Sequence, residues 1–390
     1  MFIPQKILIK KFLDNFEHIE TGSIELTLPD GSIKKFSANK NGVNADAKIK
    51  SWKLLDYVML RGDIGLGEAY VEGMWHSDNL PNLMTFLASN IKALDDYAHG
   101  NFFNRAIFFF INNFVRKNSK EGSKKNITAH YDVGNEFYKL WLDPTMTYSS
   151  GIYSGDHNLE IAQKNKYDRI LKNISNHEKI LEIGCGWGGF MESALQKNHN
   201  VTGLTISNAQ ASFAKQRLQH KLNEKSQIKI QDYRDEKNKY DAIVSIEMFE
   251  AVGEKFWPNY FDKVHQCLEN QGLAMIQTIT IRDDLFDQYR KRSDYIRAYT
   301  FPGGMLPSLE KFKMQANRAN LDCKDVFSFG KDYAKTLKEW LKNFKKVEKT
   351  ILDFGYKQEF IRSWEFYLAL CIGGFESGQT NVSQILLQKN

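Results

Sequence analysis

Short apolar runs of strand length alternate with longer helical patterns in the second half of the chain. Five of these runs follow one another at 179–183, 200–206, 228–232, 240–246 and 272–281. Because strands that alternate with helices usually lie parallel in one sheet, the pattern predicts a doubly wound α/β fold. Two further apolar segments towards the C-terminus, DVFSFG and SQILLQ, predict strands that close the edge of this sheet.

The N-terminal part of the chain has a different pattern. Residues 23–27 alternate like a strand, a turn follows at 29–31, and helix-like patterns rich in aromatic residues come next. The polar, basic stretch RKNSKEGSKK then has the composition of a solvated linker. We therefore expect a smaller, mixed and helix-rich domain at 1–116, a linker at 117–125 and a larger catalytic domain at 126–390.

Composition narrows the class of protein without naming its function. The formal charge of +6 favours anionic surfaces, a property that lipid and nucleic acid share. The four cysteines are scattered and form no CxxC pair, so neither a disulfide framework nor a metal site is predicted. No apolar stretch approaches the roughly 20 residues that span a bilayer, and the N-terminus lacks the pattern of a secretory signal. We expect a cytoplasmic protein whose membrane contact is peripheral.

A glycine-rich loop, GCGWGG at 184–189, joins the first of the predicted parallel strands to the helix that follows. Glycines there let a ligand approach the backbone, although a tight structural turn is the alternative interpretation. Loops that bind phosphates need backbone amides and a helix terminus facing the ligand, whereas here Trp187 and Phe190 crowd the helix start. The loop therefore favours S-adenosylmethionine over a dinucleotide.

The segment EIGCG resembles the first motif of class I methyltransferases, and with WGGF after it resembles the cyclopropane fatty acid synthase family in particular. Further matching segments are GDIGLGEAYVEGMW, AHYDVGNEFYKLWLDPTMTYSSGIY, GLTISNAQ, FEAVG, FPGGMLPS and DYAKTL. The resemblance covers most of the chain. It implies a Rossmann-like, mostly parallel seven-stranded sheet, and transfer of a one-carbon unit from S-adenosylmethionine to the double bond of unsaturated acyl chains in phospholipids.

The resemblance implies nine cofactor-binding residues, which hold the methionine end, let the cofactor approach the backbone, reach the ribose and flank the adenine. In that order they are Tyr148 and Ser149; Gly184 and Gly186; Thr205, Ile206 and Gln210; Asp232 and Tyr233. The alternatives are half-buried core positions for the two tyrosines, a helix cap for Thr205 and a solvated side chain for Gln210. Most class I methyltransferases have an acidic residue where Thr205 ends the second strand, so this departure favours the resembled family over a generic methyltransferase.

The implied chemistry needs a base. An isolated alkene is a poor nucleophile, so the sulfonium methyl must be presented in line with it at a site that excludes water, where aromatic faces can stabilise the resulting cation. A base must then remove a proton from the transferred methyl before a three-membered ring can close. In the resembled family this base is thought to be a bound bicarbonate ion.

Three residues of the implied bicarbonate site are present as Glu250, Tyr333 and Cys371, and two are changed. Ser150 stands where the family has Cys, and Gln277 stands where it has His. Both can donate hydrogen bonds to an anion, but Gln277 cannot exchange a proton near neutral pH. The alternatives are a carboxylate placed by a helix dipole for Glu250 and a small buried hydrophobe for Cys371.

An aromatic segment precedes the basic linker. Phe103, Ile107, Phe110, Ile111 and Phe114 recur at helical spacing, which predicts an amphipathic helix. Burial inside the protein is one interpretation. The other is peripheral docking on the inner face of a membrane rich in anionic phospholipid, with nucleic acid excluded as a partner. The sequence leaves the oligomeric state open, and a homodimer is compatible with it.

Three competing functions remain open at this point. C-methylation of an unsaturated lipid without ring closure is supported by the missing His. A methyltransferase for a soluble small molecule is disfavoured by the N-terminal domain and by the insertion around FPGGMLPS. A non-catalytic lipid-binding protein would be expected to lose the cofactor glycines, and all of them are present.

Overall fold

The computed structural model describes residues 5–91, 94, 134–155 and 158–390. The chain divides into two compact units. The first comprises Met1–Val115, Gln288–Thr300 and Lys345–Gln379, and the second comprises Arg116–Asp287, Phe301–Phe344 and Thr380–Asn390. The predicted amphipathic helix and basic linker lie outside the described residues.

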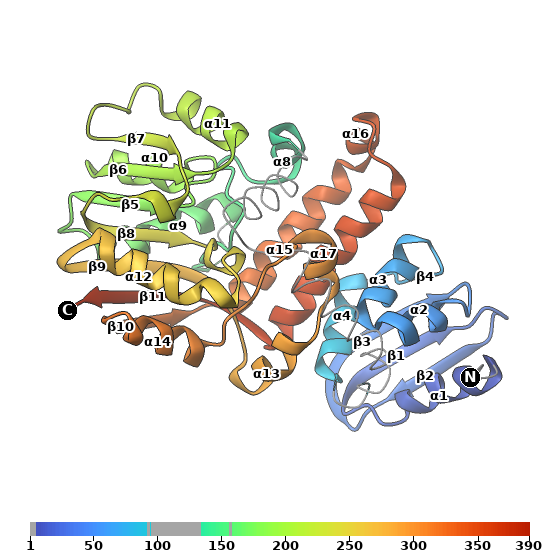
Figure 1. Ribbon diagram of the computed structural model, residues 1–390. Coiled ribbons are helices and arrows are strands. Elements are labelled where there is room, and N and C mark those ends of the chain that lie inside the picture. The colour runs from blue at the N-terminus through green and yellow to red at the C-terminus, as the bar shows by residue number, and fades with distance from the viewer. Residues whose placement is uncertain (1–4, 92–93, 95–133, 156–157) are drawn as a thin grey trace. The chain divides into compact units, whose positions relative to one another are not determined.

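The second unit is built on a seven-stranded sheet of order β10-β11-β9-β8-β5-β6-β7 (Figure 1). The five strands from β9 to β7 are parallel, and β11 runs antiparallel to its two neighbours. This order confirms the predicted α/β fold and the two closing strands. The strands are β5 (Lys179–Ile183), β6 (Asn200–Thr205), β7 (Gln227–Ile230), β8 (Tyr240–Ile246), β9 (Leu268–Ile281), β10 (Leu321–Ser328) and β11 (Thr380–Lys389).

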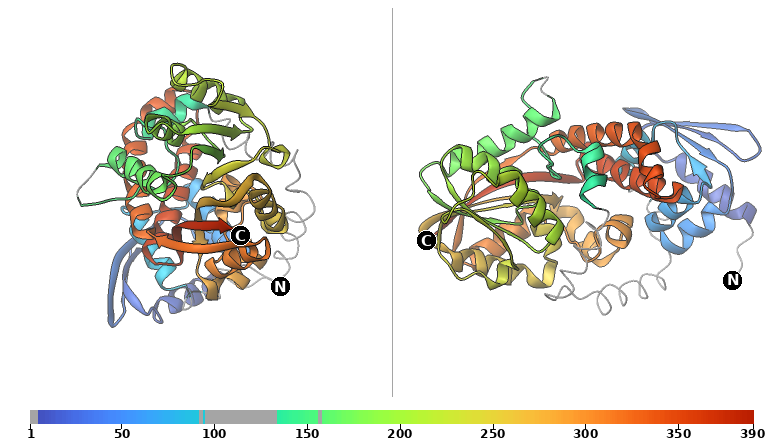
Figure 2. Two further views of the ribbon diagram at one scale, coloured as in Figure 1. Left: turned by 90° about the vertical axis from the view of Figure 1, so that its left-hand side faces the viewer. Right: turned by 90° about the horizontal axis from the view of Figure 1, so that it is seen from above.

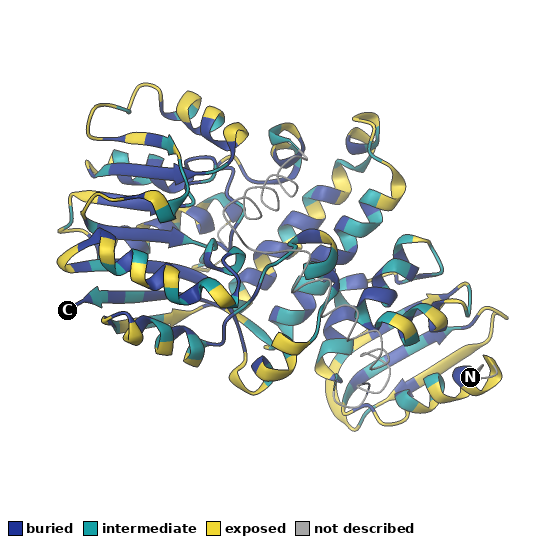
Figure 3. Cartoon of the chain, in the orientation of Figure 1, coloured by how far each residue is buried: buried dark blue, intermediate teal, exposed yellow. Residues whose placement is uncertain are grey.

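Helices cover both faces of this sheet (Figure 2). One face carries α9 (Leu159–Asn173), α10 (Gly189–Gln196) and α11 (Asn208–Leu218), whose apolar side chains form one buried cluster with residues of β5, β6, β7, β8 and β9. The other face carries α12 (Trp257–Cys267), which contacts β8, β9 and α14 (Leu309–Arg318). Because both faces are covered, the central strands are apolar and buried almost throughout, as Figure 3 shows.

The remaining helical elements of the second unit precede the sheet or connect its strands. They are α8 (Asn135–Trp141), α15 (Gly330–Lys346) and the short turns η2 (Tyr233–Asp235), η3 (Phe249–Ala251) and η4 (Glu254–Phe256). α13 (Asp283–Lys291) contributes residues to both units.

The first unit contains a four-stranded mixed sheet of order β2-β1-β3-β4 with helices. β1 (Thr21–Thr27) pairs antiparallel with β2 (Ile33–Ser37) and parallel with β3 (Lys40–Ile49), which pairs with β4 (Trp75–His76). The alternation predicted for β1 is confirmed, since its residues are buried at every second position. The helical elements are α1 (Gln5–Phe16), α2 (Leu54–Arg61), α3 (Asp63–Val71), α4 (Leu80–Ser89), η5 (Ile296–Thr300), α16 (Glu348–Asp353) and α17 (Gln358–Glu376).

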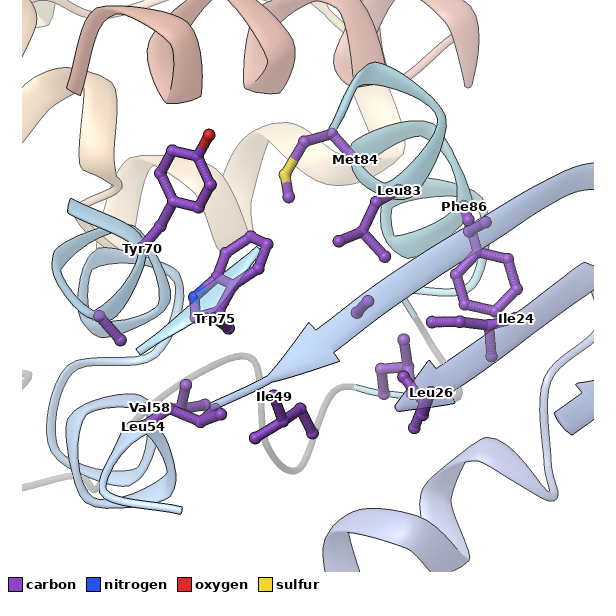
Figure 4. Close-up of a cluster of buried hydrophobic side chains, with 14 of the residues drawn as sticks. Ile24, Leu26, Ile49, Leu54, Val58, Tyr70, Trp75, Leu83, Met84 and Phe86 are labelled. Atoms are coloured by element: carbon purple, nitrogen blue, oxygen red, sulfur yellow. The ribbon is translucent and has the colours of Figure 1, made fainter. Parts of the chain in front are cut away.

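The core of the first unit takes in segments from late in the chain. Tyr295, and Phe366 on α17, belong to the same buried cluster as Tyr70 and Trp75. The ring centroids of Tyr70 and Phe366 lie 5.7 Å apart. Figure 4 shows the part of this cluster that packs over β1 and β3. The sequence pattern placed 288–300 and 345–379 in the catalytic domain, whereas their aromatic side chains group them with the N-terminal core.

Candidate active site

The glycine loop leaves the carboxyl end of β5 with its backbone in the left-handed region. Gly184 and Gly186 have φ of +83° and +50°, and the amides of Gly184 and Cys185 donate to the carbonyl of Leu204 at 3.0 and 2.8 Å. A Cβ atom built on Gly186 would meet no heavy atom within 4 Å, so the backbone is open on that side. A loop held in this way fits a ligand that lies directly against the chain.

The neighbouring strand β6 ends in a buried polar residue, and a second buried polar residue follows on α11. The Thr205 hydroxyl donates to Gln210 Oε1 at 3.0 Å, and Ile206 is half-buried between them in the chain. Ser207 caps α11 by accepting from the Gln210 amide at 3.3 Å, so Thr205 is not the cap. Gln210 is only 6% exposed, which excludes the solvated interpretation. Because Ile183 pairs with Leu204, this polar pair follows β6 directly beside the glycine loop.

The predicted adenine residues follow β7. Asp232 accepts two hydrogen bonds from the Arg234 guanidinium at 2.8 and 2.6 Å and caps the turn η2 through the Arg234 amide. Tyr233 is half-buried and packs edge-on against Tyr260, with ring centroids 5.6 Å apart. The structure therefore places both residues at the expected edge of the sheet, with the Asp232 carboxylate held by an arginine that the sequence interpretation had not considered.

The residues predicted for the methionine end lie in the segment after α8. Tyr148 is half-buried among the rings of Tyr138, Trp141 and Trp340, at 5.3, 5.7 and 5.2 Å between centroids. The aromatic surroundings of Tyr148 exclude water on one side of the segment.

Ser149 is buried beside Tyr148, and its hydroxyl accepts from the ammonium of Lys166 at 2.6 Å. Burial lowers the pKa of Lys166 to about 7, while the carboxyls of Glu247, Asp143 and Glu182 act in the opposite direction.

Three of the predicted anion-binding residues converge on a carboxylate that the sequence interpretation did not single out, that of Glu247. The Ser150 amide and the Gln277 side-chain amide donate to its Oε1 at 2.9 and 2.7 Å. The Tyr333 hydroxyl donates to its Oε2 at 2.6 Å. Glu247 directly follows β8 and is half-buried, whereas Ser150 and Gln277 are fully buried. Burial raises the pKa of Glu247, opposed by the Lys166 charge and by these hydrogen bonds.

Gln277 is oriented from its other side as well. Its Oε1 accepts from Gln384 on β11 at 3.1 Å, and the two residues face each other across the β9–β11 pair. The carbonyl of Gln277 also accepts from the Glu247 amide at 2.8 Å. Both the backbone and the side chain of Gln277 therefore hold Glu247, which fixes the amide as a donor to the carboxylate.

Glu250 occupies a separate position within the same group. Its Oε1 accepts from the Thr278 hydroxyl at 3.0 Å and from the Ile279 amide. Its Oε2 is buried and has no hydrogen-bond partner among the described residues. Burial, together with the nearby Glu247, raises the pKa of Glu250 to about 8, so this carboxyl carries a proton at neutral pH.

Cys371 is the one predicted site residue that belongs to the first unit. It lies on α17 in the first unit, where burial and the charge of Asp294 raise the pKa of its thiol. A catalytic role for Cys371 therefore stays a prediction.

The sequence interpretation missed Glu247 and Lys166. Glu247 carried a usable signal, because an acidic residue directly after a buried parallel strand lies at the edge where α/β sheets bind ligands. Lys166 carried none, because it stands in a helical pattern among the polar residues Gln163, Lys164 and Asn165. Its burial depends on the contact of α9 with the sheet.

One family model and several known relatives match most of this chain. The family described as mycolic acid cyclopropane synthetase matches residues 118–385. Tuberculostearic acid methyltransferase UfaA1 of Mycobacterium tuberculosis is 32% identical over 335 residues, which cover 83% of this chain and 78% of that protein. The cyclopropane-fatty-acyl-phospholipid synthase of Escherichia coli K12 is 31% identical over 349 residues, which cover 88% of each chain.

A solved structure of similar fold carries the product of methyl transfer. Mycolic acid cyclopropane synthase CmaA1, solved in complex with SAH and CTAB, is 30% identical to this chain and superposes with a TM-score of 0.64. The match covers 68% of this chain and 98% of that structure. This structural match agrees with the seven-stranded, mostly parallel sheet of the second unit.

Proposed function

Because the chain belongs to the mycolic acid cyclopropane synthetase family, we propose that it transfers a one-carbon unit from S-adenosylmethionine to the double bond of unsaturated phospholipid acyl chains, closing a cyclopropane ring. Membership of the family makes the protein an S-adenosylmethionine-dependent methyltransferase. The acyl chain, the phospholipid and the ring are the proposed part.

The observation that carries this proposal is the pair of carboxyls at the carboxyl edge of the sheet. Ring closure needs a proton acceptor, whereas simple methyl transfer to a nitrogen or oxygen nucleophile does not need one at this position. Burial raises the pKa of both carboxyls, that of Glu250 to about 8, while three hydrogen-bond donors oppose this shift at Glu247. Two neighbouring carboxyls in environments that push their pKa values apart are the usual mark of acid–base chemistry.

The chain's own residues supply the rest of the reaction. S-adenosylmethionine, when bound, provides an electrophilic methyl group on a sulfonium. The open backbone at Gly186 and the buried pair Thr205–Gln210 fit its binding at the ends of β5 and β6. The aromatic group around Tyr148 excludes water, and its ring faces can stabilise a cation formed on the lipid.

A lipid substrate implies contact with a membrane surface. None of the helices in the described ranges combines the length and the hydropathy needed to cross a bilayer. The net charge of +6 supports attraction to anionic headgroups at the inner face of a cytoplasmic membrane. The name of the Escherichia coli relative supports a phospholipid as the acyl carrier.

Purified protein should release S-adenosylhomocysteine when mixed with S-adenosylmethionine and vesicles of an unsaturated phospholipid. Vesicles of the saturated phospholipid with the same headgroup are the control, because they lack only the alkene. Equal release from both vesicles, or release from neither, would contradict the proposed substrate.

A second candidate function is methylation of the same double bond without ring closure. Gln277 stands where the resembled family has His, and one relative is named a tuberculostearic acid methyltransferase. Both candidates share the cofactor, the alkene and the first carbon–carbon bond. They differ in the fate of the cation, so the product distinguishes them.

A further inference from the structure

We propose that Glu247 is the base of ring closure and that its carboxylate replaces the bicarbonate ion that the sequence resemblance implies. This inference rests on the proposed function. Its first support is that Ser150, Gln277 and Tyr333, which were predicted to hold a free anion, all donate to Glu247 at 2.6–2.9 Å. Gln277 and Tyr333 donate through their side chains, and Ser150 donates through its backbone amide while its hydroxyl donates to the Gly151 carbonyl. A small anion would have to displace this carboxylate to use them.

The second support is the backbone at Glu247. Its φ of +49° lies in the left-handed region, which side chains other than those of Gly, Asn and Asp rarely adopt. Glycine would adopt this conformation without strain, whereas the Glu247 side chain makes the same backbone conformation cost free energy. Strained residues of this kind concentrate at functional sites, where the surrounding contacts hold them.

The third support is the charge around Glu247. The groups facing it are the Lys166 ammonium on α9, the Glu250 carboxyl on η3 and the Tyr333 hydroxyl on α15. Glu182 on β5 acts on Lys166 in turn. Burial raises the pKa of both carboxyls, but Glu247 accepts three hydrogen bonds and faces the Lys166 charge, and these contacts favour its ionised form.

The step balances without any further reactant. The alkene π electrons form a bond to the donor methyl as its bond to sulfur breaks, and the sulfur leaves as a neutral thioether with that electron pair. A carbocation remains on the acyl chain. Glu247 takes one proton from the new methyl, and the electron pair of the broken C–H bond closes the ring. The proton leaves Glu247 for solvent after product release.

Two substitutions at Glu247 separate this role from a structural one. Glu247→Gly removes the carboxylate, relaxes the backbone and leaves room for a small anion among the three donors. Glu247→Gln removes the charge but fills the space. Gln271→Gly is the matched control, because Gln271 also has a positive φ, of +63°, and is exposed in β9.

Binding of ¹³C-labelled bicarbonate, followed by NMR, gives a readout that does not depend on turnover. We expect binding to Glu247→Gly, with none to wild type, to Glu247→Gln or to Gln271→Gly. Saturable binding to wild type as tight as to Glu247→Gly would overturn the replacement. If wild type released no product from unsaturated vesicles, the proposed function would fail. The bicarbonate titrations would still decide whether the Glu247 carboxylate or a free anion occupies the three donors.

Turnover tests the base itself. Wild type should work equally well in buffer depleted of carbon dioxide, and both Glu247 variants should lose on the order of a hundredfold in kcat. Added bicarbonate or formate should raise the kcat of Glu247→Gly by at least about tenfold and leave the kcat of Glu247→Gln unchanged. Dependence of wild type on added bicarbonate, or variants within about twofold of wild type, would show that Glu247 is not the base.

Discussion

Single residues at the ends of strands are proposed to decide both cofactor binding and chemistry in this enzyme. At the end of β5 the proposed residue is a glycine, because the ligand must reach the backbone. At the end of β8 it is Glu247, which gathers donors from positions 150, 277 and 333. The two positions can be tested separately, because one should affect cofactor affinity and the other turnover.

We expect Gly186→Val to weaken S-adenosylmethionine binding by at least about a hundredfold, equivalent to about 2.7 kcal/mol. The valine side chain would project into the open space beside the loop. Gly31→Val is the control, since Gly31 also has a positive φ, of +84°, and an open Cβ position in a turn of the first unit. Titration calorimetry measures the affinity, and unchanged affinity in folded Gly186→Val would remove the cofactor assignment.

Tyr333→Phe should lower kcat and move the acidic limb of its pH profile to higher pH. The hydroxyl donates to the Glu247 carboxylate at 2.6 Å, which favours the ionised form. Without this donor the pKa of Glu247 rises further, so more alkaline solution is needed to ionise the base. The pH dependence of kcat for wild type and variant measures the shift. A lower kcat with an unmoved limb would assign Tyr333 a different role.

At this scale the predicted cofactor residues and the catalytic residues differ in how local their signal is. Gly184, Gly186, Thr205 and Gln210 lie in short motifs near the ends of strands, and the resemblance of these motifs to a family was enough to name them. The environment of Glu247 depends on three donors from distant parts of the chain, and no local sequence pattern predicts that these donors lie together. The assignments of individual roles to these residues stay predictions.

Whole elements create the buried charges behind the site. α9 brings Lys166 against the sheet, and β5 carries Glu182, which is only 3% exposed and whose Oε2 has no hydrogen-bond partner among the described residues. Burial raises the pKa of Glu182 to about 8 from 4.5, with Lys166 acting in the opposite direction. The folded protein therefore holds a proton that the unfolded chain has already lost in this pH window.

Glu182→Gln should stabilise the protein increasingly as pH rises from 4.5 to about 8. Over this window the Glu182 carboxyl ionises in the unfolded chain but stays protonated in the folded protein, which lowers the free energy of unfolding of wild type, whereas Gln has no proton to lose. We expect an advantage of a few kcal/mol above the window and little below it. Urea unfolding at both ends of the window measures it, with exposed Glu178→Gln as control. An advantage that does not vary with pH would contradict this account.

Elements with strong periodicity were predicted well, and those defined by tertiary pairing were not. All seven strands of the large sheet coincide with apolar runs in the sequence. β3 was missed because its sequence, KNGVNADAKI, is poor in residues that favour strands. Its pairing with β1 buries Ala45, Ala47 and Ile49 at alternate positions, and this burial overrides the local preference. The grouping of α17 with the N-terminal core likewise depends on contacts that no local pattern shows.

At the scale of the whole molecule, charge should govern contact with the membrane. The protein should sediment with vesicles containing acidic phospholipid, and added salt should release it, because the attraction of a net charge of +6 is screened. Vesicles of neutral phospholipid are the control and should bind less. Equal binding to both, insensitive to salt, would show that docking is hydrophobic.

The central claim is that the enzyme converts the alkene of a phospholipid acyl chain into a cyclopropane. Its most direct test is mass spectrometry of the fatty acids of a bacterial host that lacks such an enzyme and expresses this chain, with Gly186→Val as control. We predict unsaturated fatty acids that gain one CH2 and no longer take up hydrogen under mild catalytic hydrogenation, in wild type only. Fatty acids that gain a carbon but carry a methyl or methylene branch in place of a ring would contradict the claim.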